Sequence, residues 1–286
     1  MSKQKLVIVD ADGLIYHSSR ETLEESIQIL NDKIQNIYDK TEATHSIFFI
    51  SQGRYFRHGI SPDYKKSRGN TKSPLKWLQT LKMYLKEAYN AQSMPLVEAD
   101  DLAAYFTNKT LYLATPPTGN PYLTDVVEGD WEHVLLENVL CSPDKDLLQS
   151  IEGEHFNYSY KLVDKTKPES VEKGWWVTTS KEDACLNFWK SMICGDVTDN
   201  IRGIEGRGIA YATKLFDNYG NILHEITLSA YVEKYGISQG IYEFQKNYRL
   251  LHLLSTDADF IQEIGELPTF PIINEIKPKE IIIEYI

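Results

Sequence analysis

Short apolar runs alternate with helical patterns along the first half of the chain. Residues 5–10 and 46–51 are apolar runs bounded by polar residues, which is typical of strands buried on both faces of a parallel sheet. Between them, apolar residues recur at a helical spacing from Thr22 to Lys40. This strand–helix–strand order predicts an α/β fold with a mostly parallel central sheet flanked by helices.

The same patterns predict elements in the rest of the chain. In chain order these are a helix at 73–90, a strand at 94–97, a helix at 98–107, a helix at 125–137, a strand at 138–142, edge strands within 154–179 and a helix at 181–194. A glycine-rich passage at 195–208 precedes a mostly helical remainder, and the last twenty residues fit no pattern. We expect an α/β core over 1–190 and a helical region over 191–286.

The net charge of −11 argues at first against a nucleic-acid ligand, but this charge is unevenly distributed. From Arg54 to Lys86 the chain has nine Lys or Arg and one acid, a net charge of +8, so the rest carries −19. A basic element beside a carboxylate-rich body favours contact with an anionic polymer. A solvated surface face is the alternative reading of the same charges.

Other bulk features narrow the class of protein. No apolar run approaches the roughly 20 residues that span a bilayer, and the N-terminal run stops at Asp10, too short for a secretory signal. Cys141, Cys185 and Cys194 share no metal-binding spacing and cannot all pair, which indicates reduced thiols in a cytosol. We expect a cytoplasmic protein with no membrane partner.

Four acidic clusters follow predicted strands or a glycine turn. They are Asp10; Glu98, Asp100 and Asp101; Asp144 and Asp146; and Asp196 and Asp199. Because the carboxyl ends of parallel strands face one crevice of an open α/β sheet, we expect these side chains to gather there. Each cluster alone has a plainer reading, since an acid can cap a helix or a turn.

Gathered carboxylates repel each other and raise one another's pKa unless cations neutralise them. Oxygen ligands without a histidine or cysteine shell suit Mg²⁺ or Mn²⁺. A pair of such ions about 4 Å apart can activate a water molecule and stabilise both oxygens of a phosphodiester displacement. The acidic clusters therefore predict a site for two divalent ions.

Five motifs in this order resemble the metal-dependent 5′-nuclease (flap endonuclease) family, and within it the phage-type 5′–3′ exonucleases. They are "VIVDADGL" (7–14), "YFRHGISPDYKKSRG" (55–69), "VEADDLAAY" (97–105), "SPDKDLL" (142–148) and "MICGDVTDNIRGIEGRG" (192–208). The helical "EFQKNYRLLHL" (243–253) is similar to the end of the family's domain. The resemblance implies a PIN-like core, a basic arch segment at about 52–90 and a helix-three-turn-helix element at about 195–220.

The resemblance also implies roles for single residues. Metal ligation falls to Asp10, Glu98, Asp100, Asp144, Asp146, Asp196 and Asp199, with Asp101 as a nearby or shared ligand. Tyr64 would stack on a base near the scissile bond, while Lys65 and Arg68 hold the scissile phosphate. Single-strand grooves use such contacts, although Tyr64 could also be an exposed loop aromatic and Lys65 simple surface charge.

Gly203, Gly206 and Gly208 permit tight turns and a close approach of backbone amides to a phosphate, where the helix from Ile209 begins. An ordinary glycine connection between helices is the plainer alternative. The resemblance implies that this hairpin binds duplex DNA, with Arg207 among its contacts, and holds a K⁺ on its carbonyls.

The chain departs from the family pattern at its candidate site. Gln52 stands where the family usually supplies another metal-site aspartate, and Asp12 either compensates or is a local turn acid. Ala210 stands where the family often has a phosphate-binding lysine, for which Arg207 or Lys214 could substitute.

A further departure lies between the acidic helix and the next strand. Residues 111–137 form a longer connection than the family has, and Asp130 within it imitates the carboxylate pair of the "SPDKDLL" motif. We take Asp144 and Asp146 as the true pair, because they follow the better predicted strand.

Rival functions explain less of the sequence. A haloacid-dehalogenase-type phosphatase would account for "DADG", but the three-residue spacing of Asp196 and Asp199 is wrong for it. A PIN-type ribonuclease shares the metal-cluster logic but lacks the glycine hairpin. A DNA-binding protein without catalysis would remain if Gln52 has weakened the metal site.

The motifs therefore predict a metal-dependent 5′–3′ exonuclease or 5′-flap endonuclease that hydrolyses phosphodiesters of DNA. RNA–DNA hybrids are a further expected substrate, cleaved in the manner of a ribonuclease H. We expect a monomer that acts in phage DNA replication, in the cytoplasm of the infected cell and beside other replication proteins.

Overall fold

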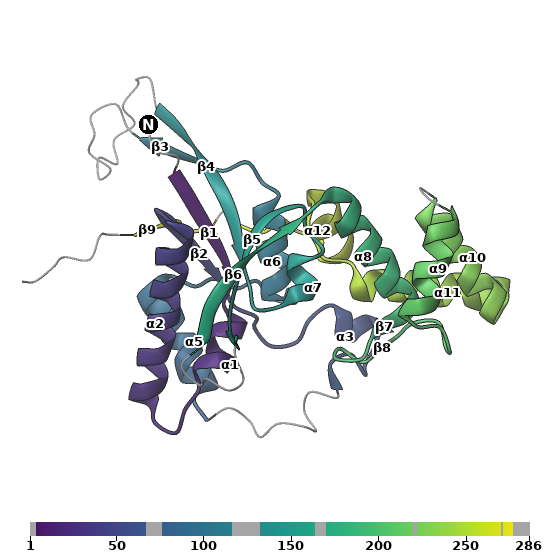
Figure 1. Cartoon of the computed structure of the whole chain (residues 1–286), viewed down its shortest axis with the longest axis horizontal. Helices are drawn as coiled ribbons and strands as arrows, with labels where there is room; N and C mark the ends of the chain where they lie inside the picture. The colour runs from purple at the N-terminus through teal and green to yellow at the C-terminus, as the bar shows by residue number, and fades with distance from the viewer. Residues whose placement is uncertain are drawn as a thin grey trace, which may run out of the picture.

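The computed structural model describes residues 4–66, 76–115, 132–163, 170–219, 222–269 and 271–276. A twisted sheet with helices on both faces forms one part, and a group of helices lies to one side of it (Figure 1). No helix in these ranges is long and apolar enough to cross a membrane.

The central strands of the sheet are parallel, which confirms the predicted fold class. β1 (Gln4–Asp10) pairs in parallel with β2 (His45–Phe49) on one side and with β4 (Glu132–Cys141) on the other. The strand order is β6-β5-β4-β1-β2-β9, with β5 (Gly153–Leu162), β6 (Val171–Thr179) and β9 (Asn274–Glu275) completing it. β3 (Tyr112–Thr115) pairs antiparallel with β4.

Alternate residues of β1 face two separate hydrophobic layers, as the pleat of a strand requires. Val7 and Val9 pack with α1 (Asp12–Ser18), α2 (Leu23–Thr41) and α5 (Leu78–Tyr89). Leu6 and Ile8 face the opposite layer, which contains α6 (Ala99–Thr107), α7 (Lys145–Leu148) and α12 (Asp257–Glu263). The sheet is therefore covered on both faces.

A separate hydrophobic cluster holds the helical part together. It lies among α8 (Lys181–Cys194), α9 (Ile209–Tyr219), α10 (Leu223–Tyr235) and α11 (Ile237–Leu251), around buried Tyr231 and Phe244. β7 (Gly195–Asp196) and β8 (Ile201–Arg202) form a small hairpin between α8 and α9. After α11 the chain returns to the sheet, where Phe260 joins the core. A domain boundary near residue 190 stays a prediction.

Two predicted elements are wrong. Residues 94–97 form no strand and make only a single bridge, Tyr55 to Leu96. Pro95 lacks the N–H donor that a ladder needs, and Leu96 has a positive φ of 65°. The helix predicted at 125–137 is a strand from Glu132 onward, because β4 pairs with β1 and β3 on its two edges. Residues 116–131, including Asp130, lie outside the described residues.

Candidate metal centre

The end of β1 and the segment after β4 lie side by side. Val9 pairs with Cys141, which places Asp10 beside Ser142. The buried Ser142 hydroxyl donates to Asp10 Oδ2 at 3.0 Å and accepts from the N–H of Asp144 at 3.1 Å. One hydroxyl therefore fixes two of the predicted metal ligands relative to each other.

Close packing behind Asp10 leaves room only for glycine at residue 13. A Cβ there would lie 2.3 Å from Pro143 Cγ and 2.6 Å from the Tyr158 hydroxyl. Tyr158 is fully buried, and its hydroxyl donates to the backbone oxygen of Asp10 at 2.5 Å. The "DADG" sequence is thus explained in part by the approach of α1 to the segment after β4.

Burial raises the pKa of Asp10 to about 7, helped by the negative charges of Asp12 and Asp144 and opposed by the Ser142 hydrogen bond. Partial desolvation of its carboxylate also raises the pKa of Asp146, although most of the side chain is exposed, together with the charges of Asp144, Asp196 and Asp199. Asp144 therefore lies near Asp10, and Asp196 and Asp199 lie near Asp146, as acids that follow the carboxyl ends of neighbouring strands should.

Glu98, Asp100 and Asp101 form the remaining cluster, with one carboxylate oxygen of each within 4.8 Å of the others. Glu98 is the N-cap residue of α6, as the capping alternative has it, but its side chain makes no capping hydrogen bond and turns to Arg57, Tyr64 and Lys65 instead. In the other two clusters the capping alternative holds in part, because Asp144 accepts from the N–H of Asp146 and Asp196 accepts from the N–H of Thr198.

Arg57, in α3 (Arg57–Ile60), is the functional residue that the sequence reasoning missed. Its buried guanidinium donates to both oxygens of Asp101 at 2.6 and 2.8 Å and to Glu98 Oε2 at 2.9 Å. It also donates to the backbone oxygens of Leu250 and His252. Nothing in the sequence distinguishes it from the other eight basic residues between Arg54 and Lys86.

The pKa values of Glu98 and Asp100 in this cluster are shifted in opposite directions. Burial alone would raise the pKa of Glu98, but the positive charges of Lys65 and Arg57 outweigh it and lower that pKa. For Asp100 the same two cations do not outweigh burial and the charges of Glu98 and Asp101, so its pKa is raised well above its usual range. Glu98 is therefore firmly ionised in the folded protein. The ionised form of Asp100 would be stabilised by a further cation.

Asp101 is the most deeply buried acid of this cluster. It is fully buried, Arg57 occupies both of its oxygens, and its Oδ1 also accepts from the N–H of Leu254 at 3.0 Å. This arrangement suits a residue that holds Arg57 in place beside Glu98.

Tyr64 and Lys65 lie across the crevice and connect its two sides. The Tyr64 hydroxyl donates to Glu98 Oε2 at 2.8 Å and to Asp199 Oδ2 at 3.2 Å. The Lys65 ammonium contacts Glu98 Oε1 and lies 3.6 Å from Asp199 Oδ2. Tyr64 is buried, so it is not the exposed loop aromatic of the alternative reading, and in this conformation its ring is not open for stacking. Arg68 lies outside the described residues.

Gln52 points away from the acids, as its exposed side-chain oxygen accepts from the Ser93 hydroxyl at 2.7 Å. Asp12 accepts from the N–H of Ser51 at 3.1 Å and lies 3.8 Å from the Lys82 ammonium. Asp12 therefore ties α1 to the segment after β2, which is a long-range contact and not a local turn. Its compensation for Gln52 stays a prediction.

The three glycines of the "GIEGRG" hairpin are under different structural constraints. A Cβ on Gly203 would lie 2.2 Å from the backbone oxygen of Ile193, so close packing alone requires it. Gly206 has a φ of +75°, and a Cβ on Gly208 would meet nothing within 4 Å. Arg207 lies over the ring of Tyr211 at 4.1 Å. The DNA and K⁺ contacts of this hairpin stay predictions.

The donor set fits a divalent cation. Its ligands are carboxylate oxygens, which hard ions prefer, and the raised pKa values of Asp10, Asp100 and Asp146 show negative charge that lacks full compensation. Such a crevice at the carboxyl ends of a parallel sheet is typical of metal-dependent phosphoryl-transfer proteins.

Comparisons with known proteins agree with this class, although no protein-family model matches the chain. The chain is 25% identical over 248 residues to a flap endonuclease Xni of Pseudoalteromonas translucida, covering 81% of this chain and 86% of that protein. It is 28% identical over 178 residues to a 5′-3′ exonuclease of Aquifex aeolicus, covering 62% of this chain and only 53% of that protein.

A solved structure of the bacteriophage T5 flap endonuclease, in complex with DNA and metal ions, shares the fold. Its TM-score is 0.60 at 20% identity, and the match covers 92% of this chain and 94% of that one. The resemblance to the 5′-nucleases is therefore confirmed in sequence, and the shared fold agrees with it.

Proposed function

We propose that this protein is a divalent-metal-dependent nuclease that hydrolyses DNA phosphodiesters from a 5′ end or at a 5′ flap. The convergence of Asp10, Glu98, Asp144 and Asp146 with the Asp196–Asp199 turn carries this proposal, because so many carboxylates in one crevice require cations. The names of the similar proteins, flap endonuclease and 5′-3′ exonuclease, support the choice of substrate.

The acids of the crevice would hold Mg²⁺ or Mn²⁺, in two positions. When bound, these ions supply electrostatic activation of a water molecule and stabilisation of the attacking and leaving oxygens. Asp10 and Asp144 would act as a fixed pair because Ser142 joins them. Glu98 would be held in its ionised form by Arg57 and Lys65.

Lys65 has two successive tasks in this proposal. Its ammonium lies between Glu98 and Asp199, where it offsets their negative charge. Release from these acids would free it to contact the scissile phosphate, together with Arg68, and to offset charge that develops there. Release of the same segment would also expose the ring of Tyr64 for stacking on a base.

The chemical step is a hydrolysis. The oxygen of water forms a bond to phosphorus, the bond from phosphorus to the 3′ oxygen breaks, and that oxygen takes up a proton. The products are a free 3′ hydroxyl and a 5′-phosphorylated nucleotide or short oligonucleotide.

The test uses 5′-flap, blunt duplex and RNA–DNA hybrid substrates, each in Mg²⁺ and in EDTA, beside Asp146→Asn. We expect cleavage of at least one DNA substrate in Mg²⁺ and none in EDTA. Cleavage of the hybrid would extend the proposal to a ribonuclease H, and K⁺-dependent duplex binding would test the hairpin contact. Absence of metal-dependent cleavage of every substrate would refute the proposed function.

A further inference from the structure

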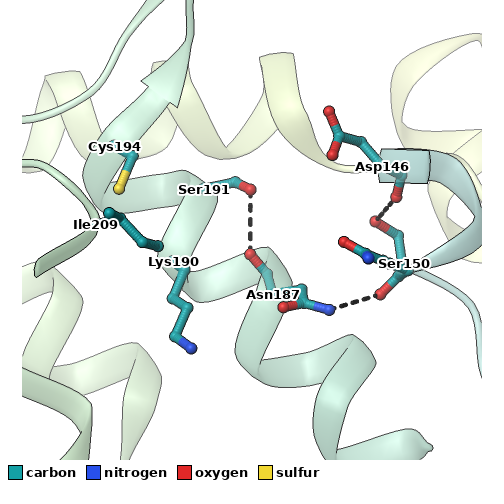
Figure 2. A pocket seen from close by; sticks show the side chains of 8 residues that line it. Asp146, Ser150, Asn187, Lys190, Ser191, Cys194 and Ile209 are labelled. Carbon is teal, nitrogen blue, oxygen red and sulfur yellow. Dashed lines mark hydrogen bonds between the residues drawn. The ribbon is translucent and has the colours of Figure 1, made fainter. Parts of the chain in front are cut away.

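A pocket beside the acidic crevice is lined, apart from Asp146, by residues that the proposed reaction does not use. It has a volume of about 180 Å³ and lies between the end of α7 and the second half of α8. Asp146 stands at one end, and Lys190, Cys194 and Ile209 stand at the other (Figure 2). The pocket therefore runs from a proposed metal ligand to the first residue of α9, just after the glycine hairpin.

The walls of this pocket are held by hydrogen bonds of their own. The Asn187 side-chain amide donates to the backbone oxygen of Gln149 at 3.3 Å, which joins α8 to the end of α7. The hydroxyls of Ser150 and Ser191 donate to backbone oxygens within their own segments (Figure 2). The pocket is thus preformed and polar, as a site for a charged group needs to be.

Lys190 supplies the positive charge of the pocket. Its side chain is half-buried, and among the described residues it makes no hydrogen bond or ion pair. Lys190 lines the same wall of the pocket as Cys194, which lies one helical turn farther along α8. In a chain with a net charge of −11, a half-buried lysine without an acidic partner indicates an anionic ligand.

We propose that this pocket binds a phosphate group esterified to a nucleoside, one that belongs to the DNA strand next to the scissile position, with Lys190 as its cation. The proposal rests on the proposed function, because a cation bound at Asp146 would supply the second positive charge of the pocket. Ile209, which is 61% exposed, would offer an apolar contact to the adjoining sugar.

The test compares Lys190→Ala with Lys181→Ala. Both remove one lysine charge from α8, but Lys181 is the exposed first residue of the helix and lies outside the pocket. Affinity for a fluorescent 5′-flap duplex is measured by anisotropy in Ca²⁺ and in EDTA, between 50 and 200 mM salt. A strand phosphate predicts that Lys190→Ala lowers affinity about fivefold to tenfold and lowers the salt slope by about 1.

Two further measurements test whether the charge of Lys190 matters and whether the pocket binds a strand phosphate or a released nucleotide. Lys190→Arg should retain the salt slope, because it keeps the charge. Thymidine 5′-monophosphate at millimolar concentration should compete no better with the wild type than with Lys190→Ala; selective competition with the wild type would show that the pocket takes the released nucleotide instead.

Equal affinity and salt slope for Lys190→Ala and Lys181→Ala would overturn the inference. This failure differs from failure of the proposed function, which is read from Mg²⁺-dependent cleavage by the wild type. If cleavage occurs and Lys190→Ala binds normally, the nuclease stands and the pocket has no part in DNA binding.

Discussion

The two ends of the acidic crevice balance their negative charge in different ways. At one end, Glu98 and Asp101 are buried and paired with Arg57, and Lys65 also contacts Glu98. At the other, Asp144, Asp146 and Asp196 are more exposed, and the only ion pair these three make among the described residues is Lys145 with Asp146, at 4.0 Å.

This difference separates folding from metal binding. The paired end carries its own cations, so it is stable without metal and any loss of a partner leaves a buried charge alone. The open end has mutually repelling acids near water, and it gains most from an external cation. Substitutions at the first end should cost stability, and those at the second should cost metal affinity and activity.

The largest effect is expected from Arg57→Ala. This change leaves Glu98 and Asp101 buried without their shared partner, and breaking a buried ion pair in this way costs roughly 3–5 kcal/mol. Urea unfolding in EDTA measures the loss. Arg54→Ala, which removes an exposed cation three residues earlier, should change stability by no more than about 0.5 kcal/mol; an equal loss in the two variants would contradict the comparison.

Asp146→Asn is the matching change at the open end. We expect activity in Mg²⁺ to fall on the order of 100-fold, because a proposed metal ligand is lost. Stability in EDTA should stay the same or rise slightly, since one repelling charge is removed. Cleavage assays and urea unfolding of the same preparations measure both, with Lys145→Ala as the control; full activity of the mutant would remove Asp146 from the site.

A smaller effect is expected from pH. The pKa of Asp10 is raised in the folded protein to about 7, from a usual 3.8. The folded state therefore binds the proton more tightly than the unfolded state, and stability in EDTA falls as pH rises from about 4 to about 7. Between pH 5 and pH 7 we expect this carboxyl to contribute about 2 kcal/mol to the fall.

Urea unfolding in EDTA across this pH range measures the effect, and Asp10→Asn should flatten the profile. Mg²⁺ should restore stability most strongly above pH 7, where the carboxyl is ionised. A wild-type profile that rises with pH over the same range would show that Asp10 does not hold a proton in the folded state.

The smallest effect is expected from Gln52→Asp. Gln52 points toward Ser93 rather than into the crevice, so an acid there would need to turn inward to reach a cation. We expect the Mg²⁺ concentration for half-maximal activity to fall only a few-fold. No change at all in a metal titration would mean that another residue fills the role.

The sequence predicted the parts of the site that depend on sheet topology. Asp10 and Asp144 meet because the parallel strands β1 and β4 end at the same edge, and the apolar run of β1 and the strand predicted at 138–142 revealed those strands. The prediction from sequence was wrong where pairing between distant segments determines the secondary structure. Residues 132–137 carry a helical pattern, yet pairing with β1 and β3 makes them a strand.

Arg57 shows a second limit of sequence reasoning. Its acceptors come from α6 and from the end of α11, 41 to 195 residues away, and no local pattern connects such distant positions. The same holds for Tyr64, whose burial depends on Glu98 and on the turn that contains Asp199. Motifs identified these segments, but only the fold shows which charges neutralise each other.

The long sequence separation between Arg57 and its backbone acceptors has a consequence for the order of folding during synthesis. Its guanidinium needs the backbone oxygens of Leu250 and His252, which leave the ribosome 193 and 195 residues after it. Until then the Arg57 guanidinium that pairs with Glu98 and Asp101 lacks two of its hydrogen bonds. The strands that precede the other acids have already been made by that stage. A growing chain therefore completes the contacts of Arg57 only after residue 252 has been made, and a chain that ends before Leu250 lacks the contacts to Leu250 and His252.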